Sequence, residues 1–366
     1  MAFHIDERIR AAFAPPRYLV PPASGIDVST SGVKAVRLAA RASGITLASY
    51  AQVRLDAGAY ADGEILDHEA VSGAIAVVAK QVGISSANAA LPEPKSYLFE
   101  TTVSGMEKAQ WLLEVEQRLD EHIPLAPADA VFDVVADGPA EQGRTRVAGV
   151  GFARRVVDES LAVFDAAKVG VRSLESETFA MARALLRPDN SSTVLIVDVG
   201  KTTTKMAVLE KRVPRFATTI GIGGHALTLA VQKHFGVTEQ EARRVKAERG
   251  IVPTVGNEDY LAAMLSTVSA IRDELGRRLQ YWQERVAVTK QHEPVSRILL
   301  VGGNASLRGF PEYLEGALRV PVAAGDVFTN FAPRDAWLPP LDYGESLAYA
   351  TAIGLALRDF ALPYGN

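Results

Sequence analysis

Two short segments of the sequence share a residue pattern that could hold a polyphosphate. Residues 27–38 align without a gap on residues 198–209, and both follow Asp-Val-(Ser/Gly)-x-(Ser/Thr)-x-x-Lys-x-x-x-Leu. Small residues let backbone N–H groups approach a phosphate, and hydroxyl side chains add donors. An Asp at the end of a strand can hold a hydrated Mg²⁺. Two such turns facing each other across a cleft would bind a polyphosphate and its metal from both sides.

Each segment alone also fits an ordinary turn between two strands, because short Gly/Ser motifs are common in turns. The presence of two copies makes a ligand site the better interpretation than two ordinary turns. In each copy an apolar strand precedes the Asp, small residues follow it, and a second strand includes the Lys. Two copies in register therefore favour a ligand site built from two halves of the chain.

Two glycine pairs could complete the same site. Gly302 and Gly303 end an apolar strand that begins at Ile298, and the missing Cβ atoms would let the backbone lie against a purine or ribose. Gly223 and Gly224 precede a helix that we expect to begin near residue 225. The N-terminus of a helix suits a phosphate. Each pair is a weak signal by itself.

Composition excludes several classes of protein. The chain has 366 residues, of which 48% are hydrophobic, and a formal net charge of −4. Binding to a nucleic-acid backbone usually requires a basic excess, so we expect no nucleic-acid partner. The sequence has no cysteine, which excludes disulfides, thiolate metal sites and a cysteine nucleophile. Because no uncharged apolar run approaches about 18 residues, we expect a soluble, cytoplasmic protein.

The motifs need an alternation of strands and helices to bring them together. Turn residues and apolar patterning predict an α/β fold. The expected strands cover 25–38, 45–55, 87–91, a strand from 97, 130–135, 146–151, 193–199, 204–209, 215–222 and a strand from 298. The expected helices cover 67–82, 107–122, 156–167, most of 225–285, and 345–358. The segment 97–152 is small enough to be an inserted subdomain.

At these residues the sequence resembles the actin-like ATPase superfamily, and within it the PilM family of type IV pilus assembly proteins, which is related to FtsA. The resemblance covers nearly the whole chain, and the order and spacing of its motifs are fairly specific. The segments that carry it are 24–34, 88–93, 122–124, 150–167, 175–185, 299–303 and 347–356.

The resemblance implies a two-lobed actin-like fold made of two ribonuclease H-like repeats, with an inserted subdomain called 1C. It divides the chain into an N-terminal arm (1–22), subdomain 1A (23–96, with 153–188 and 344–366), subdomain 1C (97–152) and lobe 2 (189–343). Lobe 2 would consist of 2A and a helical part, 2B, at about 225–290.

The resemblance also implies ATP and Mg²⁺ in the cleft between the lobes. The residues expected to bind the cofactor are Asp27, Ser29, Thr30, Ser31, Lys34, Asp198, Gly200, Lys201, Thr202, Thr203, Gly223, Gly224, Lys246, Gly302, Gly303 and Asn304. Asp27 and Asp198 would hold Mg²⁺ through water. Ser29, Arg243 and Asn304 depart from the family pattern, which usually has glycine, an acid and glycine at these positions.

Hydrolysis would need a group that orients or deprotonates the attacking water. Glu177 lies on the connecting segment where actin-like ATPases keep such a group, and it is our candidate. The alternative is that Glu175 and Glu177 cap a helix that begins near Thr178. The sequence leaves enzymatic activity open and predicts at most a weak ATPase.

The implied function is that of an ATP-dependent cytoplasmic scaffold at the inner face of the inner membrane. Subdomains 1C and 1A would hold the N-terminal cytoplasmic tail of a bitopic, PilN-type inner-membrane protein as an extended peptide. Contact with the membrane would occur only through partners, which include other components of the pilus motor and alignment complex. A homo-oligomer or ring is compatible with this function.

Two alternatives stay open at this point. A small-metabolite kinase of the same superfamily would need a catalytic Asp and a substrate pocket in the first lobe, and 87–100 offers no convincing candidate. An FtsA-like filament protein of cell division would usually end in a basic amphipathic membrane helix. The sequence 360–366 supplies none.

Overall fold

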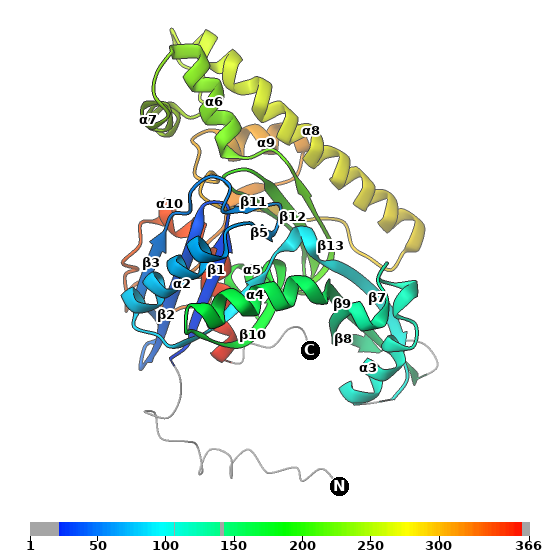
Figure 1. Ribbon diagram of the computed structural model, residues 1–366. Helices are drawn as coiled ribbons and strands as arrows, with labels where there is room; N and C mark the ends of the chain where they lie inside the picture. Colours follow the sequence, from blue (N-terminus) through cyan, green and yellow to red (C-terminus); the bar gives the residue numbers. More distant parts are fainter. Residues whose placement is uncertain (1–21, 106, 140–142, 361–366) are drawn as a thin grey trace.

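The computed structural model describes residues 22–105, 107–139 and 143–360. The chain forms two lobes, each with a five-stranded sheet, and a smaller subdomain beside them (Figure 1). Nearly all of the predicted N-terminal arm (1–22) and the last residues of the range given to 1A lie outside the described residues. No helix among the described residues is long and apolar enough to cross a membrane.

The first sheet has the strand order β10-β6-β1-β2-β3. Its strands are β1 (Ser24–Ser29), β2 (Gly32–Arg41), β3 (Gly44–Val53), β6 (Ser86–Leu91) and β10 (Gly170–Ser176). The first three strands form an antiparallel meander, and β6 and β10 extend the sheet in parallel with β1. The strand-like segment expected at 25–38 forms two strands joined by a turn, as the repeated pattern indicated. Strand β10 was not among the expected strands.

The second sheet repeats this topology, with the order β13-β12-β11-β14-β15. Its strands are β11 (Thr193–Val199), β12 (Thr204–Glu210), β13 (Val213–Ile220), β14 (Arg297–Val301) and β15 (Val322–Ala324). Again an antiparallel meander comes first, and two parallel strands follow on the other side of its first strand. Both halves of the chain therefore have the same strand order, as expected of a duplicated unit.

Helices cover both faces of the first sheet. One face packs on α2 (His68–Val82) and α4 (Arg154–Ala166), while α5 (Glu177–Leu185) and α11 (Ala350–Leu357) contact the other. Helix α11 lies very close to its neighbours: a Cβ on Gly25 would be 2.2 Å from the Ala352 carbonyl oxygen, and one on Gly354 would be 1.8 Å from the Ala180 carbonyl oxygen. Only glycine permits these contacts.

The last helix is shorter than the expected 345–358. It is divided into α10 (Tyr343–Ser346), a 3-10 turn (Leu347–Tyr349) and α11. The Leu347 carbonyl accepts the N–H of Gly302 at 3.0 Å, so it is not free to continue a regular helix.

The helical part of the second lobe consists of α6 (Gly224–Phe235), α7 (Glu239–Arg249) and the long α8 (Glu258–Thr289). A capping box of Thr238 and Glu241 begins α7. Buried side chains recur along α8 every three or four residues, from Tyr260 to Trp282, so one stripe of this helix faces the core. Helix α9 (Phe310–Leu318) packs beside it.

The inserted subdomain is an antiparallel sheet with the order β7-β9-β8 and its own hydrophobic core. It comprises β7 (Tyr97–Val103), β8 (Ala130–Pro139), β9 (Thr145–Ala153) and α3 (Lys108–Glu116). The helix expected at 107–122 is shorter: α3 ends at Glu116, and a separate 3-10 turn (Leu119–Glu121) follows.

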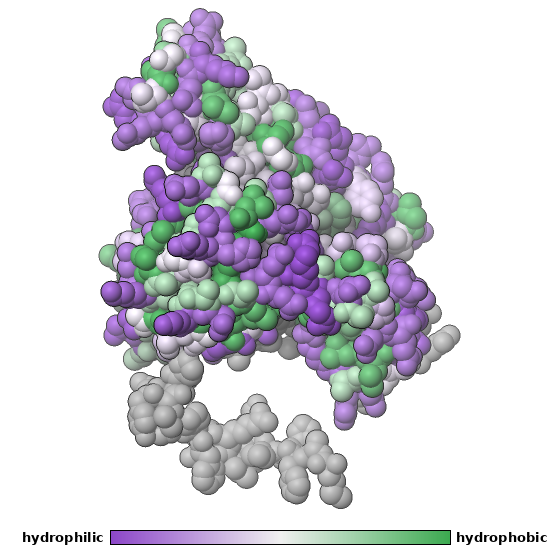
Figure 2. Space-filling view, in the orientation of Figure 1, coloured by the Kyte–Doolittle hydropathy of each residue, from purple (hydrophilic) through white to green (hydrophobic). Residues whose placement is uncertain are grey.

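The described residues also include several short elements. They are the hairpin β4 (Tyr60–Ala61) and β5 (Glu64–Ile65), and 3-10 turns at Glu93–Lys95, Pro127–Asp129 and Arg358–Phe360. Figure 2 shows the face of the molecule that is seen in Figure 1, and this face is mostly hydrophilic, with small, separated hydrophobic areas.

Candidate nucleotide-binding cleft

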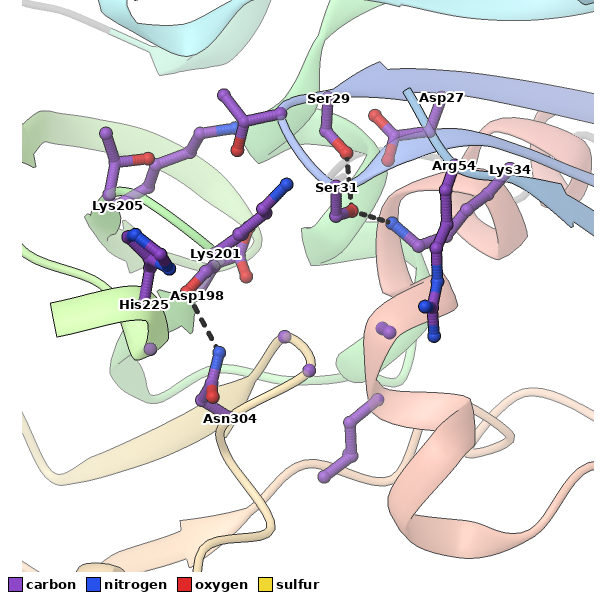
Figure 3. A pocket seen from close by; sticks show the side chains of 18 of the residues that line it. Asp27, Ser29, Ser31, Lys34, Arg54, Asp198, Lys201, Lys205, His225 and Asn304 are labelled. Carbon is purple, nitrogen blue, oxygen red and sulfur yellow. Dashed lines mark hydrogen bonds between the residues drawn. The ribbon is translucent and has the colours of Figure 1, made fainter. Parts of the chain in front are cut away.

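A cleft of about 930 Å³ lies between the lobes. Six Lys or Arg side chains and four Asp or Glu side chains line it, which favours an anionic ligand. The predicted binding residues that line it are Asp27, Ser29, Thr30, Ser31, Lys34, Asp198, Gly200, Lys201, Thr203, Gly224, Lys246, Gly302, Gly303 and Asn304. Thr202 and Gly223 lie directly beside these residues but are not part of the lining. In Figure 3 the labelled residues of the two lobes face each other across the cleft.

The first turn joins β1 to β2 through two residues, Thr30 and Ser31. The register places Asp27 directly opposite Lys34 on the neighbouring strand. The Lys34 ammonium donates to the Ser31 hydroxyl at 2.9 Å, and that hydroxyl is 2.9 Å from the Ser29 hydroxyl (Figure 3). The first turn thus presents a lysine and two hydroxyl groups to the cleft.

The second turn joins β11 to β12 through four residues, 200–203. Its register places Asp198 opposite Lys205, as in the first copy. The Gly200 N–H donates to the Thr203 carbonyl at 3.0 Å, and the N–H groups of Gly224 and His225 donate to the carbonyls of Gly200 and Lys201. These bonds fix the turn against the N-terminus of α6.

The two turns touch each other. The Thr202 hydroxyl donates to the Thr30 hydroxyl at 3.1 Å, which is a direct contact between the lobes. Thr202 is exposed.

Gly302 supports the second turn from the end of β14. Its φ is +92°, and a Cβ there would be 2.2 Å from the Asp198 Oδ1 atom. Both facts require glycine. The structure therefore gives Gly302 a definite role: it lets the strand end lie against the carboxylate of Asp198. At Gly303, by contrast, the nearest atom to an added Cβ would be 4.0 Å away.

Asn304 connects the second turn to α7. Its amide nitrogen donates to the Gly200 carbonyl at 3.0 Å, and its Oδ1 accepts the Lys246 ammonium at 2.8 Å. Lys246 also donates to the Gly224 carbonyl and the Thr228 hydroxyl. Burial, together with the nearby Arg243, lowers the pKa of Lys246 to about 8. A Cβ on Gly224 would overlap the Asn304 amide, so the close approach requires glycine there too.

Lys205 links the lobes behind the turns. Its ammonium forms an ion pair with Glu177 at the start of α5, and it lies near Asp198 and Asp27. Burial opposes the charge on Lys205, but Glu177 and these two carboxylates outweigh it and raise its pKa. For the acid Glu177, burial acts in the opposite direction on the pKa and raises it. The ion pair joins an element of the first lobe to a strand of the second.

Glu177 is 2% exposed and is not among the residues that line the cleft. At the N-terminus of α5, the Thr178 N–H is bound by an acid other than the two that the capping alternative names. Helix α5 begins at Glu177, and the Thr178 N–H donates to Glu93 at 3.2 Å. Glu175 instead pairs with Arg183 at 2.6 Å and with Arg358 at 2.8 Å.

Several residues of the cleft were not predicted from the sequence. Lys205 could have been found, because it occupies the same position in its copy of the repeat as Lys34. Arg54, His225, Glu239, Gln240 and Arg243 also line the cleft, and no motif marks the first four. Glu239 is held by Arg243 on the same helix at 3.0 Å, and this pairing lowers the pKa of Glu239.

The chain is similar to known proteins over most of its length. The family model described as "Type IV pilus assembly protein PilM" matches residues 25–360. A structure titled "PilM-PilN type IV pilus biogenesis complex" matches with a TM-score of 0.73 and 20% identity, covering 94% of this chain and 99% of that chain.

MreB5 of Spiroplasma citri is also similar in structure. Its complex with AMPPNP matches with a TM-score of 0.54 and 13% identity, covering 95% of this chain and 98% of that chain. Its complex with ADP matches with a TM-score of 0.51 and 12% identity, covering 93% and 96%. These likenesses, together with the two repeated sheets, show a two-lobed fold of the actin-like ATPase superfamily.

Proposed function

This chain belongs to the PilM family of type IV pilus assembly proteins, and on that premise we propose that it binds ATP between its lobes and holds the cytoplasmic tail of a PilN-type membrane protein. It would act as a scaffold at the inner face of the inner membrane, in contact with the membrane only through its partners. The proposal joins two sites, the cleft and the inserted subdomain.

The observation that carries ATP binding is the pair of turns that face one cleft from opposite lobes. Lys34, Lys201 and Lys246 bring positive charge to the lining, and the turn residues add hydroxyl and N–H donors. Beside the second turn, the backbone at Gly303 is open on its Cβ side, where an added Cβ would meet no atom closer than 4.0 Å, and this leaves room for part of a flat ring system. A nucleoside polyphosphate matches this arrangement of charge and open backbone.

The residues present fit a hydrated Mg²⁺. Asp27 and Asp198 both line the cleft near the phosphate-binding turns. Among the described residues there is no group of three or more His, Cys, Asp or Glu side chains that could hold a metal ion. Magnesium usually keeps several waters and takes one or two carboxylates together with phosphate oxygens. In this role, Asp27 and Asp198 would hold its water shell, and Mg²⁺ would neutralise phosphate charge.

Titration with a fluorescent ATP analogue tests this part of the proposal. We expect wild type to bind it, and Lys201→Ala to weaken binding about tenfold through loss of a cation at the phosphates. Lys290→Ala, a residue at the C-terminal end of α8 that is not part of the cleft lining, is the control and should bind like wild type. Equal affinities for all three proteins would contradict the assignment of the cleft.

ATP hydrolysis has less support in the structure than ATP binding. Glu177 stays our candidate for orienting water, but its ion pair with Lys205 and its burial restrict it in this conformation. We therefore propose slow hydrolysis at most, with ATP serving mainly to stabilise the closed form. Phosphate release by wild type and Glu177→Gln measures this, and an unchanged rate in the variant would remove Glu177 from the mechanism.

The inserted subdomain is our proposed site for the PilN-type tail, together with the adjoining part of the first lobe. Its outer strands, β7 and β8, each have only one hydrogen-bonded strand neighbour among the described residues. An extended peptide can pair with such an edge through its backbone. The structure titled as a PilM-PilN complex supports the choice of partner class.

Capture of a synthetic peptide with the N-terminal sequence of the neighbouring PilN-type protein tests the partnership. Wild type should retain the peptide, and a scrambled peptide should not bind. Asp27→Ala and Asp198→Ala, assayed with and without ATP, would show whether the nucleotide is needed. No capture by well-folded wild type would count against the proposed partner.

A further inference from the structure

A partly buried network of charged side chains lies where the inserted subdomain meets the second lobe. We call it the junction network, and it comprises Glu100, Asp137, Glu210, Arg215, Arg285 and His292. Glu100 is on β7 and Asp137 is on β8, so both carboxylates belong to the insertion. The other four residues belong to the second lobe.

Arg215 on β13 is the centre of the network. Its guanidinium contacts Glu100 at 3.1 Å and Glu210 at 3.1 Å, and it also pairs with Asp137. One side chain of the second lobe therefore binds two strands of the inserted sheet. Burial opposes the charge on Arg215, but Asp137 and the other two carboxylates outweigh it and raise its pKa.

A second set of contacts holds Glu100 from the end of α8. Arg285 pairs with Glu100 at 2.8 Å, and His292, in the loop after α8, lies 3.5 Å from Glu100 and 2.9 Å from Glu210. His292 also packs on Trp282, with ring centroids 4.9 Å apart. The insertion is thus held by both β13 and the α8 end of the second lobe.

The burial of this network makes it sensitive to geometry. The Arg215 side chain is 5% exposed and that of Asp137 is 10% exposed. A buried charge that loses its partner is strongly destabilised, whereas surface pairs exchange partners with water at little cost. A displacement of the insertion that separates Asp137 from Arg215 would therefore break a contact that solvent replaces poorly.

Strand β13 connects the junction network to the cleft. Arg215 is near its first residue, and after Ile220 the chain passes through 221–223 into α6, whose first residues Gly224 and His225 line the cleft. Hydrogen bonds to β12 hold the strand along its length. In Figure 1, β13 extends from the second lobe toward β7 and β9. One stiff element therefore reaches both sites.

The insertion is covalently part of the first lobe, because it lies in the chain between β6 and α4, and both of these elements belong to that lobe. The junction network and the cleft are consequently two separate contacts between the same two lobes. A ligand that fixes the relative position of the lobes at one contact must alter the other.

We propose that the junction network is a latch that couples the cleft to the position of the inserted subdomain. When the cleft is occupied, the lobes are held at the spacing at which Arg215 engages Glu100 and Asp137, and the insertion is ordered against the second lobe. By reciprocity, a ligand that orders the insertion strengthens binding in the cleft by the same factor. This inference rests on the proposed binding of ATP.

Hydrogen exchange of the full-length chain with and without MgATP tests the latch. In wild type we expect ATP to slow amide exchange about threefold or more in β7, β8 and β9. Arg215→Met should abolish this slowing in the insertion while leaving ATP protection at the two turns. Arg146→Met is the matched control, because Arg146 contacts Asp137 at 3.7 Å from within the insertion. It should respond to ATP like wild type.

Glu100→Gln serves as a second variant if Arg215→Met does not fold, since it keeps the side-chain shape and removes only the charge. It should reduce the slowing in the insertion. Protection of the turns without protection of the insertion in wild type would overturn the latch, as would an unchanged response in Arg215→Met or Glu100→Gln. Absence of protection at the turns in wild type would instead count against ATP binding.

Discussion

The two turns of the cleft have the same register but use their lysines differently. In the first lobe Lys34 donates to Ser31 within its own turn, so its charge stays beside the hydroxyls of Ser31 and Ser29. In the second lobe Lys205 pairs with Glu177 from the first lobe. Both copies have the same Asp–Lys register, and both lysines line the cleft, but Lys34 bonds within its own turn whereas Lys205 joins the lobes.

The largest expected effect comes from removing the lysine that joins the lobes. Lys205→Met leaves Glu177 buried without its partner, and we expect the free energy of unfolding to fall by about 3–5 kcal/mol. Lys34→Met removes one hydrogen bond from a charged donor and should cost about 1.5 kcal/mol. Urea unfolding of both variants measures the difference. Restoration of stability in Lys205→Met/Glu177→Leu is the control, and equal costs for the two single variants would refute the division of roles.

A second prediction concerns Gly302, which supports Asp198 in the second turn. Gly302→Ala forces a left-handed backbone on alanine and overlaps the carboxylate, so we expect a loss of about 2–3 kcal/mol in stability. Affinity for the ATP analogue should fall as well. Gly303→Ala, where a Cβ meets nothing closer than 4.0 Å, should change stability by less than about 1 kcal/mol. Similar losses at both positions would mean that contact with Asp198 is unimportant.

A third prediction separates Lys246 from the other lysines by pH. Its pKa in the unliganded protein is about 8, and a bound polyphosphate favours its protonated form. Affinity should therefore be highest below pH 8 and fall as the pH rises through this value, by about three- to tenfold between pH 7 and pH 9. Lys246→Arg keeps its charge and should show a flat profile. A decline of the same size in the arginine variant would assign the titration to another group.

The smallest effect is expected where the turns touch. Thr30→Val or Thr202→Val removes one exposed hydroxyl contact, and each should cost about 0.5 kcal/mol. The double variant should cost no more than either single one, which a double-mutant cycle from urea unfolding would measure. Additive costs would show that the two hydroxyls act independently.

The sequence predicted local features of this molecule better than its long-range contacts. Register within each meander follows from the spacing of Asp27 and Lys34, because the strands adjoin in the chain. The comparisons confirm the predicted family and the predicted fold. The site residues stay predictions, although the structure brings most of them into one cleft.

Long-range pairs carry no local signal. Glu177 and Lys205 come from different lobes, and nothing in the pattern around Glu177 distinguishes an ion pair from a helix cap. Arg215 and Glu100 are 115 positions apart in different subdomains, and neither belongs to a repeat. Arg54 lines the cleft because of where β3 ends. β15 was missed because it has only three residues and obtains its strand geometry from β14.

The close packing of α11 has a consequence for protein synthesis. This helix packs on one face of the first sheet at Gly25 and on α5 through Gly354, yet it follows the whole second lobe in the chain. The meander of the second lobe and β14 emerge before it. The strands of the first sheet precede the second lobe in the chain, but the first lobe cannot complete its core until α11 has left the ribosome. Until then the nascent chain must keep that apolar face of the first sheet from other hydrophobic surfaces.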